Sequence, residues 1–202
     1  MKHCLAMLTA MLLLWSAAPA RAQAWHGVEI DPQGLIRPQL LQSALVAYRQ
    51  HESEHLSTRS MAVVDFSQPS SQRRLFLVDM LSGDVKSFLV AHGRGSDLNH
   101  DAIADTFSDA KNSHASSLGA FRAAARYQGQ HGLSLSLDGL DPTNRSARER
   151  AVVVHSQWYV SDRMIAEHGQ LGRSWGCFVV DPAVIESLVQ HLEGGGFLYA
   201  GR

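Results

Sequence analysis

Hydrophobic positions recur with a helical period near both ends of the chain, and this pattern predicts one helix at each end. After Pro38 apolar residues stand three and four positions apart as far as the polar residues near His51: Leu40, Leu41, Ala44, Leu45 and Tyr48. A second, short helix is predicted after Asp181-Pro182 and ends at glycines 194–196. Its apolar face consists of Val184, Ile185, Leu188, Val189 and Leu192.

Between these helices the apolar runs are short and rich in β-branched residues, which favours strands. The predicted strands cover 61–66, 74–80, 85–91, 133–137, 151–155, 177–180 and 196–200. Residues 81–84 read as a hairpin turn, and the long polar stretch 93–117 predicts a functional loop. The chain is therefore predicted to be mainly β, with a single mixed β-sheet or a sandwich-like arrangement, an N-terminal amphipathic helix and a short C-terminal helix.

The first residues have the pattern of an export signal. Lys2 and His3 precede the apolar stretch 5–15, and Ala20-Arg21-Ala22 fits a signal-peptidase site. We expect a signal peptide over 1–22, an N-terminal helical extension over 23–60 and one further domain over 61–202. The less favoured alternative is an uncleaved anchor. No later segment offers the roughly 20 apolar residues of a membrane helix, so the mature chain is predicted to have no integral membrane segment.

Charge excludes one class of partner. The chain has 18 Lys and Arg against 19 Asp and Glu, a formal net charge of −1, and it lacks a dense basic stripe. Loss of Lys2 and Arg21 with the signal makes the mature chain more acidic still. A nucleic-acid partner is therefore not expected.

Cys177 is the cysteine that remains after removal of the predicted signal, in the glycine-rich run 172–177 (Gly-Arg-Ser-Trp-Gly-Cys). An exported protein normally pairs its cysteines, so an unpaired one favours a nucleophile. A thiol needs a base, and His155 at the end of the apolar run 151–154 is the best placed. Ser174 and Gly176 would shape the turn so that backbone N–H groups face an oxyanion. The alternative is a small buried cysteine and a core histidine, with Arg173 a solvated charge.

These residues resemble the signature of the YkuD-type L,D-transpeptidases, in which a histidine stands upstream of Ser-x-Gly-Cys. Further segments resemble the murein L,D-transpeptidase catalytic-domain branch, so that the similarity covers nearly all of the mature chain. They are 65–67, 90–93, 113–119, 131–135, 138–140, 144 and 147–148. The resemblance implies an L,D-transpeptidase-type fold and a catalytic domain over 61–202.

The resemblance also implies a reaction. Family members attack the bond between the L-centre of diaminopimelate and D-Ala in a peptidoglycan tetrapeptide stem, and an amine of a second stem resolves the thioester to a 3-3 cross-link. Cys177 would be the nucleophile and His155 the base, with Arg173 and Trp175 as candidate substrate-binding residues. Phe178 replaces a common proline, and Trp175 stands where relatives carry histidine or a polar residue. No cofactor or metal is implied, and the location would be the periplasm.

Competing patterns are weaker. Residues 51–55 (His-Glu-Ser-Glu-His) fit a zinc-peptidase motif, but they end a helix among polar residues, so a chance match is favoured. His92, His114 and His131 could still converge in space. A sortase would need an arginine on a strand soon after the cysteine, and papain-like enzymes place their histidine after it. The remaining alternatives are an L,D-carboxypeptidase, in which water resolves the thioester, and a non-catalytic wall-binding module.

Overall fold

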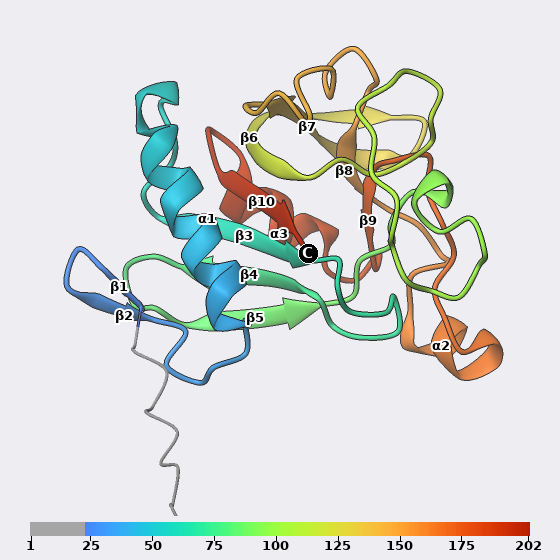
Figure 1. Ribbon diagram of the computed structural model, residues 1–202, viewed down its shortest axis with the longest axis horizontal. Coiled ribbons are helices and arrows are strands. Elements are labelled where there is room, and N and C mark those ends of the chain that lie inside the picture. The colour runs from blue at the N-terminus through green and yellow to red at the C-terminus, as the bar shows by residue number, and fades with distance from the viewer. Residues whose placement is uncertain (1–22) are drawn as a thin grey trace, which may run out of the picture.

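One mixed sheet of eight strands organises the computed structural model, which describes residues 23–202 (Figure 1). The predicted signal peptide lies outside the described residues. The strand order is β5 (Val85–Phe88), β4 (Leu75–Asp79), β3 (Ser60–Asp65), β10 (Phe197–Gly201), β6 (Gly119–Gly129), β7 (Gly132–Gly139), β8 (Val153–Ser156) and β9 (Phe178–Val180). The pairs β10–β3 and β8–β9 are parallel, and the other neighbours are antiparallel.

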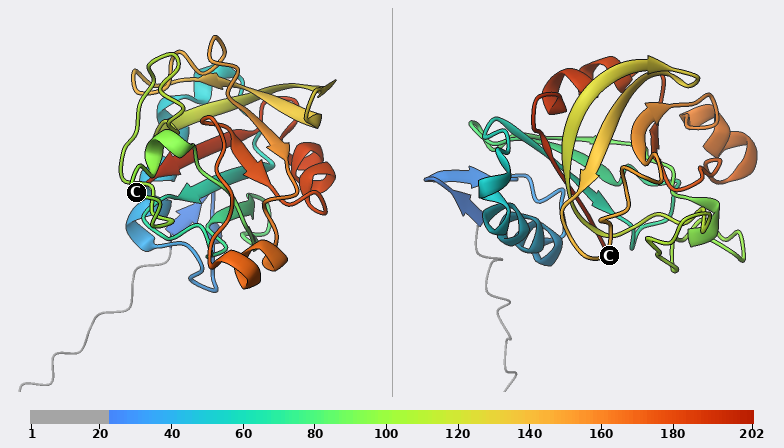
Figure 2. Two further views of the ribbon diagram at one scale, coloured as in Figure 1. Left: turned by 90° about the vertical axis from the view of Figure 1, so that its right-hand side faces the viewer. Right: turned by 90° about the horizontal axis from the view of Figure 1, so that it is seen from above.

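The two edges of this sheet approach each other. Just beyond β5, Ala91 forms an isolated bridge with Val179 of β9, and its N–H donates to the Val179 carbonyl at 2.8 Å. The sheet therefore curves almost into a barrel, as the two views in Figure 2 show. This architecture confirms the prediction of a mainly β fold with a single mixed sheet, an N-terminal helix and a short C-terminal helix.

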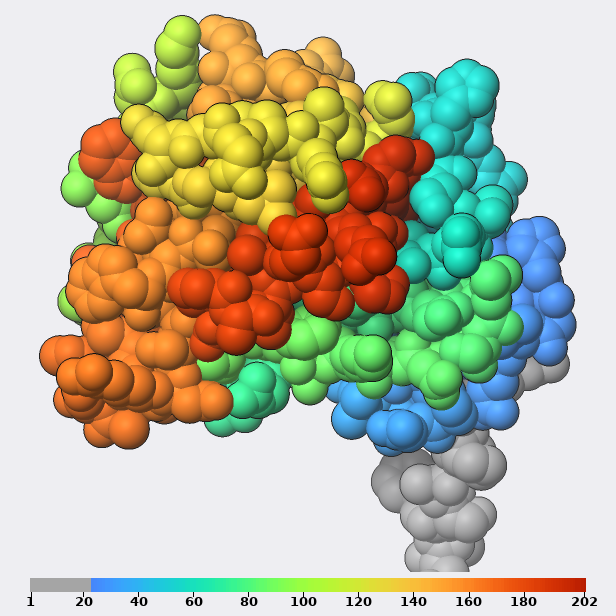
Figure 3. Space-filling model, turned by 180° about the vertical axis from the view of Figure 1, so that it is seen from behind, coloured from blue at the N-terminus to red at the C-terminus, as the bar shows by residue number. Residues whose placement is uncertain are grey.

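The remaining elements cover the sheet. They are β1 (Gln23–Trp25), β2 (Val28–Ile30), α1 (Pro38–Gln50), α2 (Asp162–His168), α3 (Ile185–Leu192) and the short 3-10 turns η1 (Glu52–Glu54) and η2 (Arg94–Ser96). Seen from behind, the hairpin β1–β2 and α1 lie at one end of the molecule and α2 at the other (Figure 3). Among the helices of residues 23–202, none has the length and hydropathy needed to span a bilayer.

Strand β3 explains why helices lie on both sides of the sheet. Side chains of a strand alternate between its faces. Met61 and Val63 pack with α1 and the N-terminal hairpin, whereas Ala62 and Val64 enter the main core with α3. Since β3 is buried on both faces, its residues 61–64 are all apolar rather than alternating with polar ones.

The predicted strands are present to within a few residues, but the sequence did not predict β6, the longest strand. Its residues Gly-Ala-Phe-Arg-Ala-Ala-Ala-Arg-Tyr-Gln-Gly include several with high helix propensity. Pairing with β10 on one side and β7 on the other overrides this local preference. Helix α2 was also not predicted, because none of its residues is buried and it has no apolar period. The proposed boundary between an N-terminal extension and the domain over 61–202 stays a prediction.

Candidate active site

The register of β8 and β9 brings His155 and Cys177 to the same face of the sheet. Val154 pairs with Phe178, and both side chains enter the main core. His155 pairs with Val179, and Cys177 directly precedes β9. Because side chains alternate, His155, Val179 and Cys177 all point away from that core. Two neighbouring apolar strands thus hold the predicted nucleophile and base next to each other.

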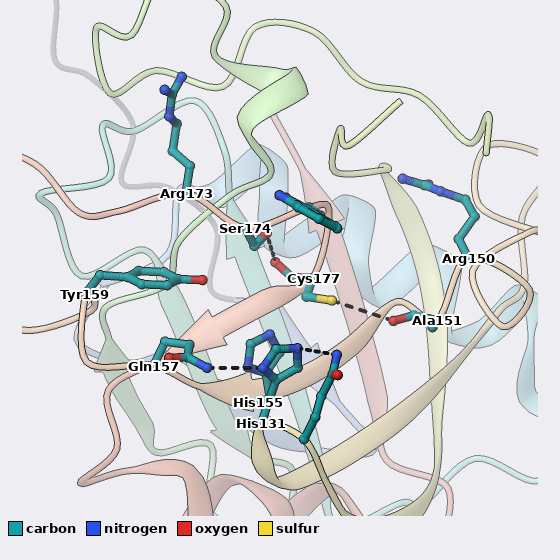
Figure 4. A pocket seen from close by; sticks show the side chains of 11 residues that line it. His131, Arg150, Ala151, His155, Gln157, Tyr159, Arg173, Ser174 and Cys177 are labelled. Carbon is teal, nitrogen blue, oxygen red and sulfur yellow. Dashed lines mark hydrogen bonds between the residues drawn. The ribbon is translucent and has the colours of Figure 1, made fainter. Parts of the chain in front are cut away.

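A cavity of about 540 Å³ opens in front of these two residues (Figure 4). Of the residues predicted for the site, Cys177, His155, Ser174, Arg173 and Trp175 line the cavity, and Gly176 lies in the turn just before the thiol. The structure adds residues that the sequence did not single out for the site: His131, Arg150, Gln157 and Tyr159.

The Cys177 thiol is held in a resting position. Its Sγ donates to the Ala151 carbonyl oxygen at 3.6 Å. Burial raises the pKa of the thiol, while a backbone hydrogen bond at Val153 and the positive charge of Arg150 act in the opposite direction. Since the net shift is upward, the thiol is protonated at neutral pH and needs a base before it can attack a carbonyl.

His155 is buried and keeps one ring nitrogen free to act as an acceptor. The residue is 3% exposed, and Nδ1 lies 3.1 Å from the Ser156 carbonyl oxygen. A carbonyl only accepts, so Nδ1 carries the proton and Nε2 is left with its lone pair. Burial is the main cause that lowers the pKa of His155, the hydrogen bond to Ser156 opposes it, and His131 lowers it further. Within residues 23–202 the imidazole and the thiol are not hydrogen-bonded to each other. Catalytic hydrogen bonds are often absent before substrate binds, so this does not exclude proton transfer between them.

His131 stacks on His155. The ring centroids are 4.5 Å apart and the planes are inclined by 20°. The side-chain amides of Gln157 and Gln130 each lie 3.2 Å from one of its ring nitrogens. His131 comes from the tip of the β6–β7 hairpin, so its place over His155 depends on a strand that the sequence did not reveal.

The turn before Cys177 requires Ser174 and Gly176. The Ser174 hydroxyl donates to the Cys177 carbonyl at 2.8 Å and accepts the Gly176 N–H at 3.1 Å. Gly176 has φ of 114°, and a Cβ there would lie 2.7 Å from the Ala115 carbonyl oxygen and 3.0 Å from Arg150. Only glycine fits both this conformation and this space.

Arg150 ties the long polar loop to the site. Its side chain is 4% exposed, and its guanidinium donates to the carbonyls of Ser108 at 2.8 Å and Ala115 at 2.6 Å. Its side chain also lines the cavity and places a positive charge near Cys177. The sequence offers Arg145, Arg148 and Arg150 in one short polar run, and nothing in their spacing indicates which is buried.

His92 contacts the turn before Cys177 through its backbone. It is 1% exposed, accepts from Arg74 at Nδ1 over 2.8 Å, and its Nε2 lies 3.3 Å from the Asp97 carboxylate. Its backbone carbonyl accepts the Ser174 N–H at 2.9 Å. Burial, helped by the charge of Arg74, lowers the pKa of His92 to about 4, so this imidazole is neutral and structural at physiological pH.

His92, His114 and His131, all within the described residues, do not meet one another. His114 stacks on Trp175 at 4.8 Å, His131 stacks on His155, and His92 lies between Arg74 and Asp97. In the zinc-peptidase pattern, His51 follows the end of α1, and its Nε2 contacts Asp141 at 2.9 Å.

Comparison with known proteins gives one family. Residues 33–200 match the family model described as L,D-transpeptidase catalytic domain. No curated protein sequence matches the chain.

Solved structures to which the chain is similar include an L,D-transpeptidase from Mycobacterium smegmatis, at 13% identity and a TM-score of 0.43 over 71% of this chain and 59% of that one. The L,D-transpeptidase LdtMt1 in complex with imipenem gives 14% and 0.43 over 71% and 59%. Mycobacterium tuberculosis L,D-transpeptidase 1 gives 13% and 0.36 over 70% and 60%. The chain thus spans about three-fifths of the length of these proteins.

Proposed function

The chain belongs to the L,D-transpeptidase catalytic-domain family, and we propose that it is a cysteine acyltransferase acting on peptidoglycan tetrapeptide stems, with D-Ala release and 3-3 cross-link formation. The observation that carries the proposal is the register of β8 and β9, which directs His155 and Cys177 into one cavity. An isolated buried cysteine would need neither a neutral imidazole beside it nor a cavity in front of it.

In the first half-reaction the thiol turns from the Ala151 carbonyl toward His155, whose Nε2 takes the S–H proton. Sγ attacks the carbonyl carbon of the diaminopimelate L-centre, and a C–S bond forms. The C–N bond to D-Ala then breaks, and His155 returns its proton to the departing amine. The product is a thioester on Cys177 and free D-Ala.

In the second half-reaction a side-chain amine of another stem attacks the thioester carbonyl. A new C–N bond forms, one amine proton passes to His155, the C–S bond breaks, and the sulfur leaves as thiolate, which takes a proton back from His155. Ser156 holds the imidazole in the tautomer that both steps require, through the Nδ1 contact of 3.1 Å. If water takes the place of the amine, the same steps give an L,D-carboxypeptidase, which is the second candidate.

Stabilisation of the tetrahedral intermediate would come from the backbone and from Tyr159. The Gly176 N–H is already bonded to Ser174, which leaves the Cys177 N–H as the adjacent backbone donor. Tyr159 lies with its hydroxyl directed into the cavity (Figure 4). Burial, with a smaller contribution from Cys177, raises the pKa of Tyr159 to about 12, so this hydroxyl remains a donor.

Arg173 and Trp175 are proposed to contact the stem, since both line the cavity. A location in the periplasm is proposed from the signal-like residues 1–22. It is tested by whether the mature protein begins near Gln23 and fractionates with periplasmic markers.

The direct test is intact-mass spectrometry of the mature protein mixed with a diaminopimelate-containing tetrapeptide stem. We expect an adduct equal to the stem minus D-Ala on the wild type and none on Cys177→Ala. Dimers among the products indicate a transpeptidase, and tripeptides alone indicate a carboxypeptidase. Folded, reduced protein that forms neither adduct nor D-Ala would overturn the proposal and favour a wall-binding module.

A further inference from the structure

A second cavity adjoins the first on the other side of Trp175. It measures about 490 Å³ and lies between α2, the η2 segment and the turn before Cys177. Arg173 and Trp175 line both cavities, so the two share a wall. We call this second cavity the alcove.

The alcove is lined by cationic and neutral side chains. Arg94 and Arg173 carry permanent charges, and His100 and His168 add two imidazoles. None of the described residues that line it is acidic. The nearest carboxylate partner of a lining side chain is Glu167, 4.0 Å from His168 and outside the lining. This distribution favours an anionic ligand.

The two guanidinium groups are fixed in place but not saturated. Arg173 donates from Nη1 to the Asp97 backbone carbonyl, and Arg94 donates from Nε and Nη2 to the His114 ring nitrogen at 3.1 and 2.8 Å. A guanidinium has five N–H donors, so each group keeps donors for a ligand. Because they are already oriented, less side-chain entropy is lost when a carboxylate binds.

The Trp175 ring lies between the two cavities and is held by contacts with its neighbours. It is 68% exposed, yet His114 stacks on its ring at 4.8 Å and the Arg94 guanidinium lies 5.4 Å from its centroid. An exposed indole fixed in this way gives an apolar surface against which a peptide can pack, beside a cationic cavity.

We propose that the alcove binds a carboxylate of the acceptor stem peptide and thereby places the acceptor amine beside the thioester on Cys177. This assignment rests on the proposed function. Acyl transfer requires a donor stem bound to Cys177 and an acceptor stem close to the same sulfur. The donor stem occupies the cavity that contains Cys177. The alcove is the adjoining cavity, and stem peptides carry free carboxylates that its arginines can bind.

A two-stage reaction separates the acceptor from the donor. In the first stage, excess tetrapeptide stem acylates the enzyme, and D-Ala release is timed. In the second, the isolated acyl-enzyme receives a diaminopimelate tripeptide, and loss of the adduct is followed by intact mass. Arg94→Gln and His168→Glu change side chains that line the alcove and do not themselves line the catalytic cavity. Arg163→Gln is the matched control, since Arg163 lies on α2 like His168 but does not line the alcove and pairs with Glu167.

We expect Arg94→Gln and His168→Glu to release D-Ala within about twofold of the wild type, and to require about tenfold more acceptor, the effect of about 1.4 kcal/mol of lost binding. Arg163→Gln should behave as the wild type. An acceptor with amidated carboxylates and a free amine should show the same weakness on the wild type and no further loss on Arg94→Gln. Slowed D-Ala release with unchanged acceptor dependence would assign the alcove to the donor and overturn the proposal.

A direct binding measurement tests the alcove independently of acyl transfer. The tripeptide is titrated into Cys177→Ala protein by calorimetry, with and without Arg94→Gln. Salt-sensitive binding that weakens about tenfold in Arg94→Gln, and equally on amidation, supports the alcove even if no acyl-enzyme forms on the wild type. Equal binding in both proteins, or indifference to amidation, would overturn the alcove and leave the acyl-transfer proposal standing.

Discussion

His92 and His155 are both buried imidazoles with lowered pKa values, yet their surroundings give them opposite capacities. His92 is bonded at both ring nitrogens, to Arg74 and to Asp97. His155 uses one nitrogen to contact the Ser156 carbonyl and turns toward a cavity that contains a thiol. Burial alone therefore does not mark a catalytic histidine. A spare ring nitrogen, open space and a reactive neighbour do.

The largest expected contrast comes from replacing each imidazole by glutamine. His155→Gln removes the proposed base, so D-Ala release should fall by about 10²- to 10⁴-fold, while the melting temperature changes little. His92→Gln should leave much more of the activity, because that ring does not reach the cavity lining. D-Ala release and thermal unfolding of both variants check this. Comparable losses of activity with matched folding would remove the distinction between the two histidines.

Stability as a function of pH is expected to report on His92. Its pKa is about 4 in the folded protein and about 6.5 in an unfolded chain, so between these values the unfolded state binds more protons. Its contribution to stability is therefore present above about pH 6.5 and is lost as pH falls toward 4, at up to about 1.4 kcal/mol per pH unit.

Denaturant unfolding at several pH values measures this loss. His92→Gln should be less stable at pH 7 by about 1–3 kcal/mol, because Arg74 and Asp97 lose a buried partner. Its stability should also decline less steeply between pH 6.5 and 4. A wild-type slope that persists unchanged in the variant would assign the acid sensitivity to other groups.

Much of this contrast was readable from the sequence, but only where a residue follows a strong local pattern. The apolar runs 151–154 and 178–180 predicted strands over 151–155 and 177–180, which carry His155 and Cys177, and Gly176 before a cysteine predicted a tight turn. His131 was not placed, since β6 has a helix-like composition and its hairpin with β7 was therefore missed. Arg150 could not be separated from Arg148, because burial of one arginine depends on which carbonyls of a distant loop approach it.

A smaller effect is expected from Arg150, which tests how the cavity around His155 and Cys177 differs from the buried surroundings of His92. Arg150→Met removes the positive charge that favours the thiolate and two hydrogen bonds to the polar loop. The pKa of Cys177 should rise further, and alkylation of the thiol at pH 7 should slow by about tenfold, equivalent to about 1.4 kcal/mol. Iodoacetamide kinetics against pH measure the change.

Two further variants test whether the effect on alkylation comes from the positive charge of Arg150 or from its contacts with the polar loop. Arg150→Lys keeps the charge and should retain most of the alkylation rate, although it loses the two-carbonyl geometry. Arg148→Met serves as the control, since Arg148 is half exposed and pairs with Asp138 away from the thiol. If Arg148→Met slowed alkylation as much as Arg150→Met, general charge rather than the local contact would be responsible.

The smallest expected effect concerns His131, whose ring covers His155 but does not replace it. A protonated His131 disfavours a second positive charge on His155, which lowers the pKa of that base. His131→Phe keeps an aromatic ring on the stack and removes the charge, so the pKa of His155 should rise. Because the proposed mechanism requires neutral His155, the acid limb of kcat/KM should move to higher pH. At pH values well above this limb, kcat/KM should change by less than about twofold. His131→Lys restores a positive charge and should leave the limb at or below its wild-type position. An unchanged limb in both variants would reduce His131 to a packing residue, and the tuning of the base would then rest on burial and Ser156 alone.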